Sequence, residues 1–150
     1  MTGLQFSLAD VDRISAAIAA VARPGDAIGL VGDLGAGKTT LARGILVALG
    51  LQGEAPSPSF AIVQPYDVPD VAMPVLHVDL YRIDDPAETG ELGLDEARAD
   101  HLLLVEWPER MGAAIWPDML VLTIEFVGED ARRLTARVPA AWGSRWPFPT

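Results

Sequence analysis

The sequence predicts an α/β protein of three layers, with a mostly parallel sheet and an antiparallel hairpin near its C-terminal end. The first observation is a short apolar run at residues 27–31, which a glycine-rich loop and then apolar residues at helical spacing follow. The second is a pair of further apolar runs, at residues 75–80 and 102–106, which read as buried strands. Strands that alternate with helices in this way favour a parallel sheet with helices on its faces.

The third observation lies further along the chain. Residues 119–127 and 134–138 are strand-like and flank an acidic turn that begins at Gly128. This pattern predicts an antiparallel hairpin.

The glycine-rich loop at residues 32–39 matches the whole pattern G-x-x-x-x-G-K-[ST] of the phosphate-binding loop, or P-loop. The predicted three-layer fold is therefore that of a P-loop nucleoside triphosphatase. The lysine of the loop, Lys38, is the only lysine among 150 residues and stands where it would reach the β- and γ-phosphates, and the hydroxyl of Thr39 stands where it would bind Mg²⁺. The strand before the loop, and the helix after it that stops at Gly50, are the context that this motif requires. We therefore expect the chain to bind a nucleoside triphosphate through Asp33, Leu34, Gly35, Ala36, Gly37, Lys38, Thr39 and Thr40.

The remaining elements follow from periodicity and turn residues. Apolar residues at helical spacing predict a helix over residues 10–22. A proline- and serine-rich turn at residues 56–59 precedes an expected strand at 60–63, and the acidic residues 84–100 predict short helices. We expect one domain over residues 1–150, in which the tail from about residue 141 has no clear period and stays unassigned.

Composition limits the classes of function. There is no cysteine, which excludes disulfides and thiolate metal sites. A net charge of −10 opposes direct binding to nucleic acid, so we expect any contact with RNA to go through a partner. Apolar stretches are shorter than the roughly 20 residues that cross a bilayer, and no signal pattern opens the chain. We expect a cytoplasmic protein with no membrane segment.

Two acids are candidates for catalysis, because the carboxyl ends of parallel strands meet where ligands bind. Asp79 lies at the end of one expected strand and Glu106 at the end of the other. The residues alone do not decide which would contact the metal ion and which would position water. Trp107 either packs on nucleotide or partner or belongs to the core, and the histidines His77 and His101 are expected to be structural.

Longer motifs carry a resemblance to a known family. Besides the loop, the chain contains Ser57-Pro58-Ser59-Phe60, His77-Val78-Asp79-Leu80-Tyr81-Arg82 and Val105-Glu106-Trp107-Pro108-Glu109. Their order and spacing resemble the bacterial ATPase of tRNA threonylcarbamoyladenosine biosynthesis, the TsaE (formerly YjeE) family. The resemblance covers nearly the whole chain.

The resemblance implies an Mg²⁺-dependent ATPase, weak alone, that helps to form N6-threonylcarbamoyladenosine at position 37 of tRNAs reading codons that begin with A. It implies two sugar-kinase-like partner proteins, of the TsaB and TsaD type. Thr39 and Glu106 would hold Mg²⁺, Asp79 would support hydrolysis together with Lys38, and Arg132, in the turn before the last strand, would lie near the nucleotide with Trp107. Ser59 would contact the γ-phosphate, at a position where the family usually has threonine.

Two other classes agree less well with the sequence. A regulatory GTPase typically reads guanine with an N-K-x-D motif, whereas this chain has no asparagine and no second lysine. A small-molecule kinase usually closes an arginine-bearing lid over its substrates. Here residues 84–100 contain Arg98 alone among several acids and would repel a phosphorylated acceptor.

Overall fold

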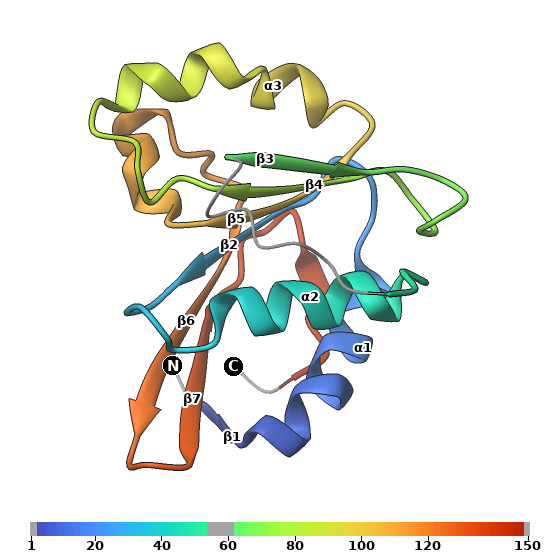
Figure 1. The fold of residues 1–150 in the computed structure, drawn as a ribbon, viewed down its shortest axis with the longest axis vertical. Helices are drawn as coiled ribbons and strands as arrows, with labels where there is room; N and C mark the ends of the chain where they lie inside the picture. The colour runs from blue at the N-terminus through green and yellow to red at the C-terminus, as the bar shows by residue number, and fades with distance from the viewer. Residues whose placement is uncertain (1–2, 54–61, 149–150) are drawn as a thin grey trace.

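The computed structural model describes residues 3–53 and 62–148. These residues form one seven-stranded sheet in the order β1-β7-β6-β2-β5-β4-β3 (Figure 1). The central strands β6, β2, β5 and β4 are parallel, and β1, β7 and β3 pair antiparallel at the two sides. The strand bounds are β1 Leu4–Phe6, β2 Ala27–Val31, β3 Val63–Tyr66, β4 Val75–Asp79, β5 Leu102–Glu106, β6 Leu120–Val127 and β7 Ala131–Arg137.

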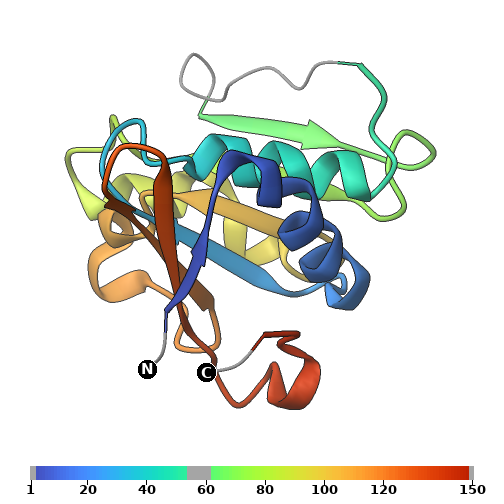
Figure 2. The same ribbon diagram turned by 90° about the horizontal axis from the view of Figure 1, so that it is seen from below.

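Helices cover both faces of the sheet, which confirms the three-layer α/β prediction. Helices α1 (Val11–Val21) and α2 (Lys38–Ala48) lie side by side against one face (Figure 2). The other face carries α3 (Leu94–Ala97) and the 3-10 segments η2 (Pro86–Leu92) and η3 (Pro108–Ala114) (Figure 1). Short 3-10 turns also occur at η1 (Leu8–Asp10) and η4 (Gly143–Arg145).

The alternation of side chains along β5 shows how one strand supports both layers. Leu102 and Leu104 belong to the apolar cluster under α1 and α2, whereas Leu103 and Val105 belong to the cluster on the opposite face. All four are fully buried. A continuous apolar run is therefore required here, because a parallel strand covered on both faces has no solvent-facing side.

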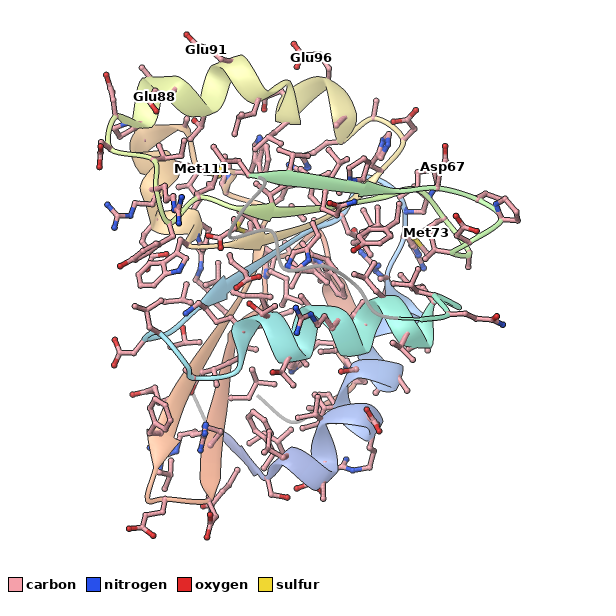
Figure 3. All side chains as sticks on the ribbon, in the orientation of Figure 1. Asp67, Met73, Glu88, Glu91, Glu96 and Met111 are labelled. Atoms are coloured by element: carbon pink, nitrogen blue, oxygen red, sulfur yellow. The ribbon has the colours of Figure 1, made fainter. Side chains whose placement is uncertain are left out.

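On the second face, η2 and α3 separate buried apolar residues from exposed acids. The side chains of Glu88, Glu91 and Glu96 point away from the sheet (Figure 3). Met111 of η3 is buried and packs in the cluster under these segments. The acidic stretch therefore forms short helices, as its sequence predicts, with its carboxylates on the outside.

Several boundaries differ from those expected. The strand expected at 60–63 is β3, which runs from Val63 to Tyr66, and residues 60 and 61 lie outside the described part. Strand β7 begins at Ala131, so Arg132 lies within the last strand rather than in the turn before it. Strand β1 was not expected, because its three residues are too few to show alternation; they are held by pairing with β7.

The tail contains more structure than its sequence suggests. Trp142 is buried in the core beneath α1 and α2. The Arg145 guanidinium donates hydrogen bonds of 2.8 and 3.0 Å to the two carboxylate oxygens of Asp26, just before β2. This tertiary contact has no periodic signal in the sequence. No helix in the described ranges is both long and apolar enough to cross a membrane.

Candidate functional site

The glycine-rich loop connects β2 to α2. Gly35 and Gly37 have φ values of 80° and 115°, which side chains other than glycine rarely adopt, so the loop turns sharply just before the helix. Lys38, the first residue of α2, is almost fully buried. Its ammonium group donates hydrogen bonds to the carbonyl oxygens of Gly32 and Asp33, the latter at 3.0 Å. The lysine side chain is therefore folded back onto the loop, and its ammonium group contacts loop carbonyl groups where a phosphate group would bind.

Burial lowers the pKa of Lys38, and the surrounding carboxylates of Glu106, Glu109 and Asp79 act in the opposite direction. The ammonium also lies 4.5 Å from the centre of the Trp107 ring, over its face. A cation held in this environment is poorly solvated. An anionic ligand within hydrogen-bond distance would therefore stabilise the Lys38 ammonium.

The two predicted acids lie next to each other. Strands β4 and β5 are parallel, and Asp79 pairs with Glu106 at the last register position of the ladder. Glu106 is 2% exposed, whereas Asp79 is half-buried and accepts a hydrogen bond of 2.9 Å from the backbone N–H of Tyr81. Burial raises the pKa of Asp79; the Tyr81 hydrogen bond opposes this shift, and the nearby Glu106 carboxylate adds to it.

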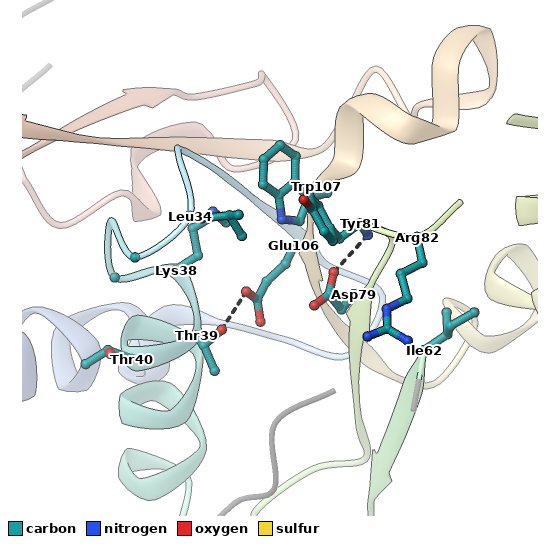
Figure 4. Close-up of a pocket in the computed structure, with 12 residues that line it drawn as sticks. Leu34, Lys38, Thr39, Thr40, Ile62, Asp79, Tyr81, Arg82, Glu106 and Trp107 are labelled. Atoms are coloured by element: carbon teal, nitrogen blue, oxygen red, sulfur yellow. Dashed lines mark hydrogen bonds between the residues drawn. The ribbon is translucent and has the colours of Figure 1, made fainter. Parts of the chain in front are cut away.

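Glu106 connects the loop helix to the sheet. Its Oε1 accepts a hydrogen bond of 2.7 Å from the hydroxyl of Thr39, and its Oε2 lies 2.7 Å from Nε2 of His77. Figure 4 shows the Glu106 carboxylate between Thr39 and Asp79. A hydroxyl and two carboxylates that converge in this way are the oxygen donors that a hard cation such as Mg²⁺ prefers.

These groups border a cavity of about 350 Å³. Its lining residues, most of which Figure 4 labels, are Leu34, Gly35, Gly37, Lys38, Thr39, Thr40, Ile62, Asp79, Tyr81, Arg82, Glu106 and Trp107. The structure therefore brings together the loop, both acids and Trp107. A second hollow of about 430 Å³ lies on the other flank of the loop, where Asp33 and Trp107 contribute to its wall.

Trp107 has an unusual backbone. Its φ of 60° is the only left-handed value at a non-glycine position among the described residues. The conformation directs the ring toward the cavity, where its centre lies 5.0 Å from that of Tyr81. Strained residues of this kind concentrate at functional sites. Trp107 lines the cavity and also packs against the apolar cluster on the second face of the sheet, so its position is compatible with both interpretations from sequence.

The other predicted residues are less central. Arg132 does not line the cavity; its Nε donates a hydrogen bond of 3.2 Å to the carbonyl oxygen of Ala36, and its guanidinium stacks on Phe126. It thus contacts the glycine-rich loop from the side. Ser59 lies outside the described residues.

The sequence does not predict three of the cavity-lining residues, Ile62, Tyr81 and Arg82. His77, which we expect to be structural, is buried and also contacts Glu106. Alternation along β4 places residues 77 and 79 on one face of the strand, which is a signal for His77. Tyr81 and Arg82 follow the end of β4 at Asp79 and have no such signal. The ring of His101, by contrast, has hydrogen-bond contacts only with the neighbouring Ala97 and Asp100 among the described residues.

Comparison with known proteins agrees with this geometry. A family model described as "Threonylcarbamoyl adenosine biosynthesis protein TsaE" matches residues 6–135. The chain belongs to the TsaE family. It is 40% identical over 118 residues to the tRNA threonylcarbamoyladenosine biosynthesis protein TsaE of Bacillus subtilis, covering 78% of this chain and 72% of that one.

Other relatives extend the match. The Streptomyces coelicolor protein of the same name is 37% identical over 131 residues, covering 86% of this chain and 88% of that protein. A crystal structure of YdiB from Bacillus subtilis superposes with a TM-score of 0.75 at 30% identity, covering 97% of this chain and 93% of the other. The TsaE family and the P-loop-like fold suggest a nucleotide-hydrolysing role in tRNA modification.

Proposed function

We propose that this chain is an Mg²⁺-dependent ATPase required to form the threonylcarbamoyl group on adenosine 37 of tRNAs that read codons beginning with A. The observation that carries the proposal is the convergence of Lys38, Thr39, Asp79 and Glu106 on one cavity at the end of β2, β4 and β5. Membership of the TsaE family supports the pathway. The cavity supports the chemistry.

The loop residues would bind the phosphates. Backbone N–H groups from Asp33 to Thr40 would surround the phosphate oxygens, and the Lys38 ammonium would exchange its present carbonyl partners for the β- and γ-phosphates. Trp107 and Arg132 would contact the nucleotide from the two sides of the loop. Ser59 would add a hydroxyl near the γ-phosphate.

The acids would serve hydrolysis. The donor set fits Mg²⁺, which Thr39 and Glu106 would hold and which would neutralise charge on the phosphates. Asp79, less buried than Glu106 and facing the same cavity, would orient the water that attacks the γ-phosphorus. The products are ADP and inorganic phosphate.

Partners would complete the enzyme. We propose that the chain acts in the cytoplasm with two sugar-kinase-like proteins, of the TsaB and TsaD type, and that it hydrolyses ATP slowly without them. Its net charge of −10 opposes direct attraction to a phosphate backbone, so the partners would hold the tRNA.

ATP turnover by the purified chain, alone and with both partners, tests this proposal. We expect slow hydrolysis alone and faster hydrolysis in the complex, with both rates reduced in Glu106→Gln. Rapid turnover that needs no partner and transfers phosphate to a small acceptor would instead identify a kinase.

A further inference from the structure

Beyond these roles, we propose that His77 is a positioning residue that fixes the orientation of the Glu106 carboxylate for the metal ion, an inference that rests on the proposed ATPase function. Nε2 of His77 lies 2.7 Å from Oε2 of Glu106. Neither family membership nor the loop motif assigns this histidine a role.

The sheet register explains how the two side chains meet. Asp79 pairs with Glu106 across β4 and β5, and His77 pairs with Leu104 one step back on the same face. His77 is therefore the diagonal neighbour of Glu106, which is within reach of a long side chain on a shared face. The contact between His77 and Glu106 therefore follows from the register of two paired strands.

The surroundings of the ring are otherwise apolar. His77 is 0% exposed, and its strand neighbours on that face, Val75 and Leu104, belong to the apolar cluster under α2. Its Nδ1 has no hydrogen-bond partner within residues 3–53 and 62–148. Glu106 is thus the one polar contact that the described structure offers this ring, and a buried polar group is costly without such a contact.

The contact also determines which nitrogen carries the proton. With a proton on Nε2, the ring donates to the carboxylate. With the proton only on Nδ1, the Nε2 lone pair would face a carboxylate oxygen at 2.7 Å, and the two acceptors would repel each other. We therefore assign a protonated Nε2.

The hydrogen bond from His77 fixes Oε2 of Glu106 and thereby sets the direction in which Oε1 points. With Oε2 bound to His77, Oε1 points at the Thr39 hydroxyl, whose oxygen is the other protein ligand expected for the cation. Carboxylates that bind metal ions depend on such outer partners, and their loss typically reduces metal affinity or activity by 10–100-fold. Without His77, the carboxylate could rotate away from the cation.

Two substitutions separate the hydrogen bond from the packing. His77→Phe keeps an aromatic ring at this position and removes the donor, whereas His77→Gln restores an amide N–H close to the position of Nε2. For each folded variant, ADP affinity is measured by calorimetry in EDTA and over a series of Mg²⁺ concentrations. We expect unchanged affinity in EDTA for both, a roughly 10-fold or larger rise in the Mg²⁺ requirement for His77→Phe, and a much smaller rise for His77→Gln.

An unchanged Mg²⁺ requirement in His77→Phe would overturn the proposal, and so would equal losses in the two variants. If His77→Phe does not fold, nitrogen-15 NMR of the unsubstituted protein decides: a proton on Nε2 supports the assignment, and a bare Nε2 contradicts it. Failure of the unsubstituted protein to bind ADP would count against the ATPase function itself, which keeps the two hypotheses apart.

Discussion

The hydroxyl of Thr39 donates a hydrogen bond of 2.7 Å to Glu106, a residue 67 positions further along the chain. Thr39 stands in the first turn of α2 and Glu106 is the last residue of β5. The contact exists because Leu41 and Ile45 of α2 are buried in the same cluster as Leu104. The apolar core thus sets the distance between the loop and the acid that would hold the cation.

Lys38→Ala should weaken ATP binding by roughly 1.5 to 3 kcal/mol, which is about 10- to 150-fold, because a charge-assisted contact is lost and no other lysine can replace it. Calorimetric titration with ATP and Mg²⁺ measures the change. Arg13→Ala, which removes the same charge from an exposed site on α1, is the control and should leave the affinity unchanged. Equal affinities for Lys38→Ala and the unsubstituted protein would remove the phosphate-binding role.

Replacing either acid by its amide should affect hydrolysis more than binding, because the loop still holds the phosphates while the transition state loses support. For Asp79→Asn we expect a fall in kcat of roughly 10²- to 10⁴-fold. Glu106→Gln should also reduce kcat and in addition raise the Mg²⁺ requirement. Steady-state phosphate release and ADP titration separate the two effects. Parent-like turnover in both variants would show that the acids are structural.

Sequence reasoning identified the parts of the site that periodicity and motif make visible. The glycine-rich loop, β2 and α2 lie where residues 27–50 predict them, and the two strand-end acids meet as parallel strands require. The features that the sequence did not predict depend on contacts between distant segments. The contact of His77 with Glu106 depends on the register of β4 and β5. The left-handed backbone at Trp107 could not be predicted, because glycine, the residue that usually indicates this conformation, is absent there.

The packing of α1 on α2 gives a prediction for stability. A Cβ at Gly44 would lie 2.2 Å from the Ser15 hydroxyl oxygen and 2.9 Å from its Cβ, so the helices would have to separate. We expect Gly44→Ala to lower the free energy of unfolding by about 1–3 kcal/mol. The control is Gly90→Ala, where a Cβ would meet nothing within 4 Å. Urea unfolding measures both, and equal stabilities would contradict the close helix contact.

The ion pair between Arg98 and Asp118 gives a prediction for pH dependence. Two hydrogen bonds, of 2.9 and 2.7 Å, from the Arg98 guanidinium lower the pKa of Asp118 below its ordinary value of 3.8. A lowered pKa in the folded state stabilises the protein above the unfolded value, and this stabilisation is lost as pH falls through the folded one. Because the Asp118 side chain is 45% exposed, we expect less than about 1 kcal/mol.

Asp118→Asn should therefore lower the free energy of unfolding at pH 7 and have a smaller effect near pH 2. Urea unfolding across this range measures the difference, and the same substitution in an Arg98→Ala background is the control. If Asp118→Asn has the same effect at both pH values, or if its pH dependence persists without Arg98, the ion pair is not the source of the pH-dependent stability.

The measurement that tests the central proposal most directly is mass spectrometry of nucleosides from total tRNA after depletion of this protein in its host. We predict that N6-threonylcarbamoyladenosine falls, that an intact copy of the gene restores it, and that a copy carrying Lys38→Ala does not, because the modification would require ATP at the loop. Unchanged threonylcarbamoyladenosine after depletion would contradict the proposed function, even if ATP binds to the chain as described.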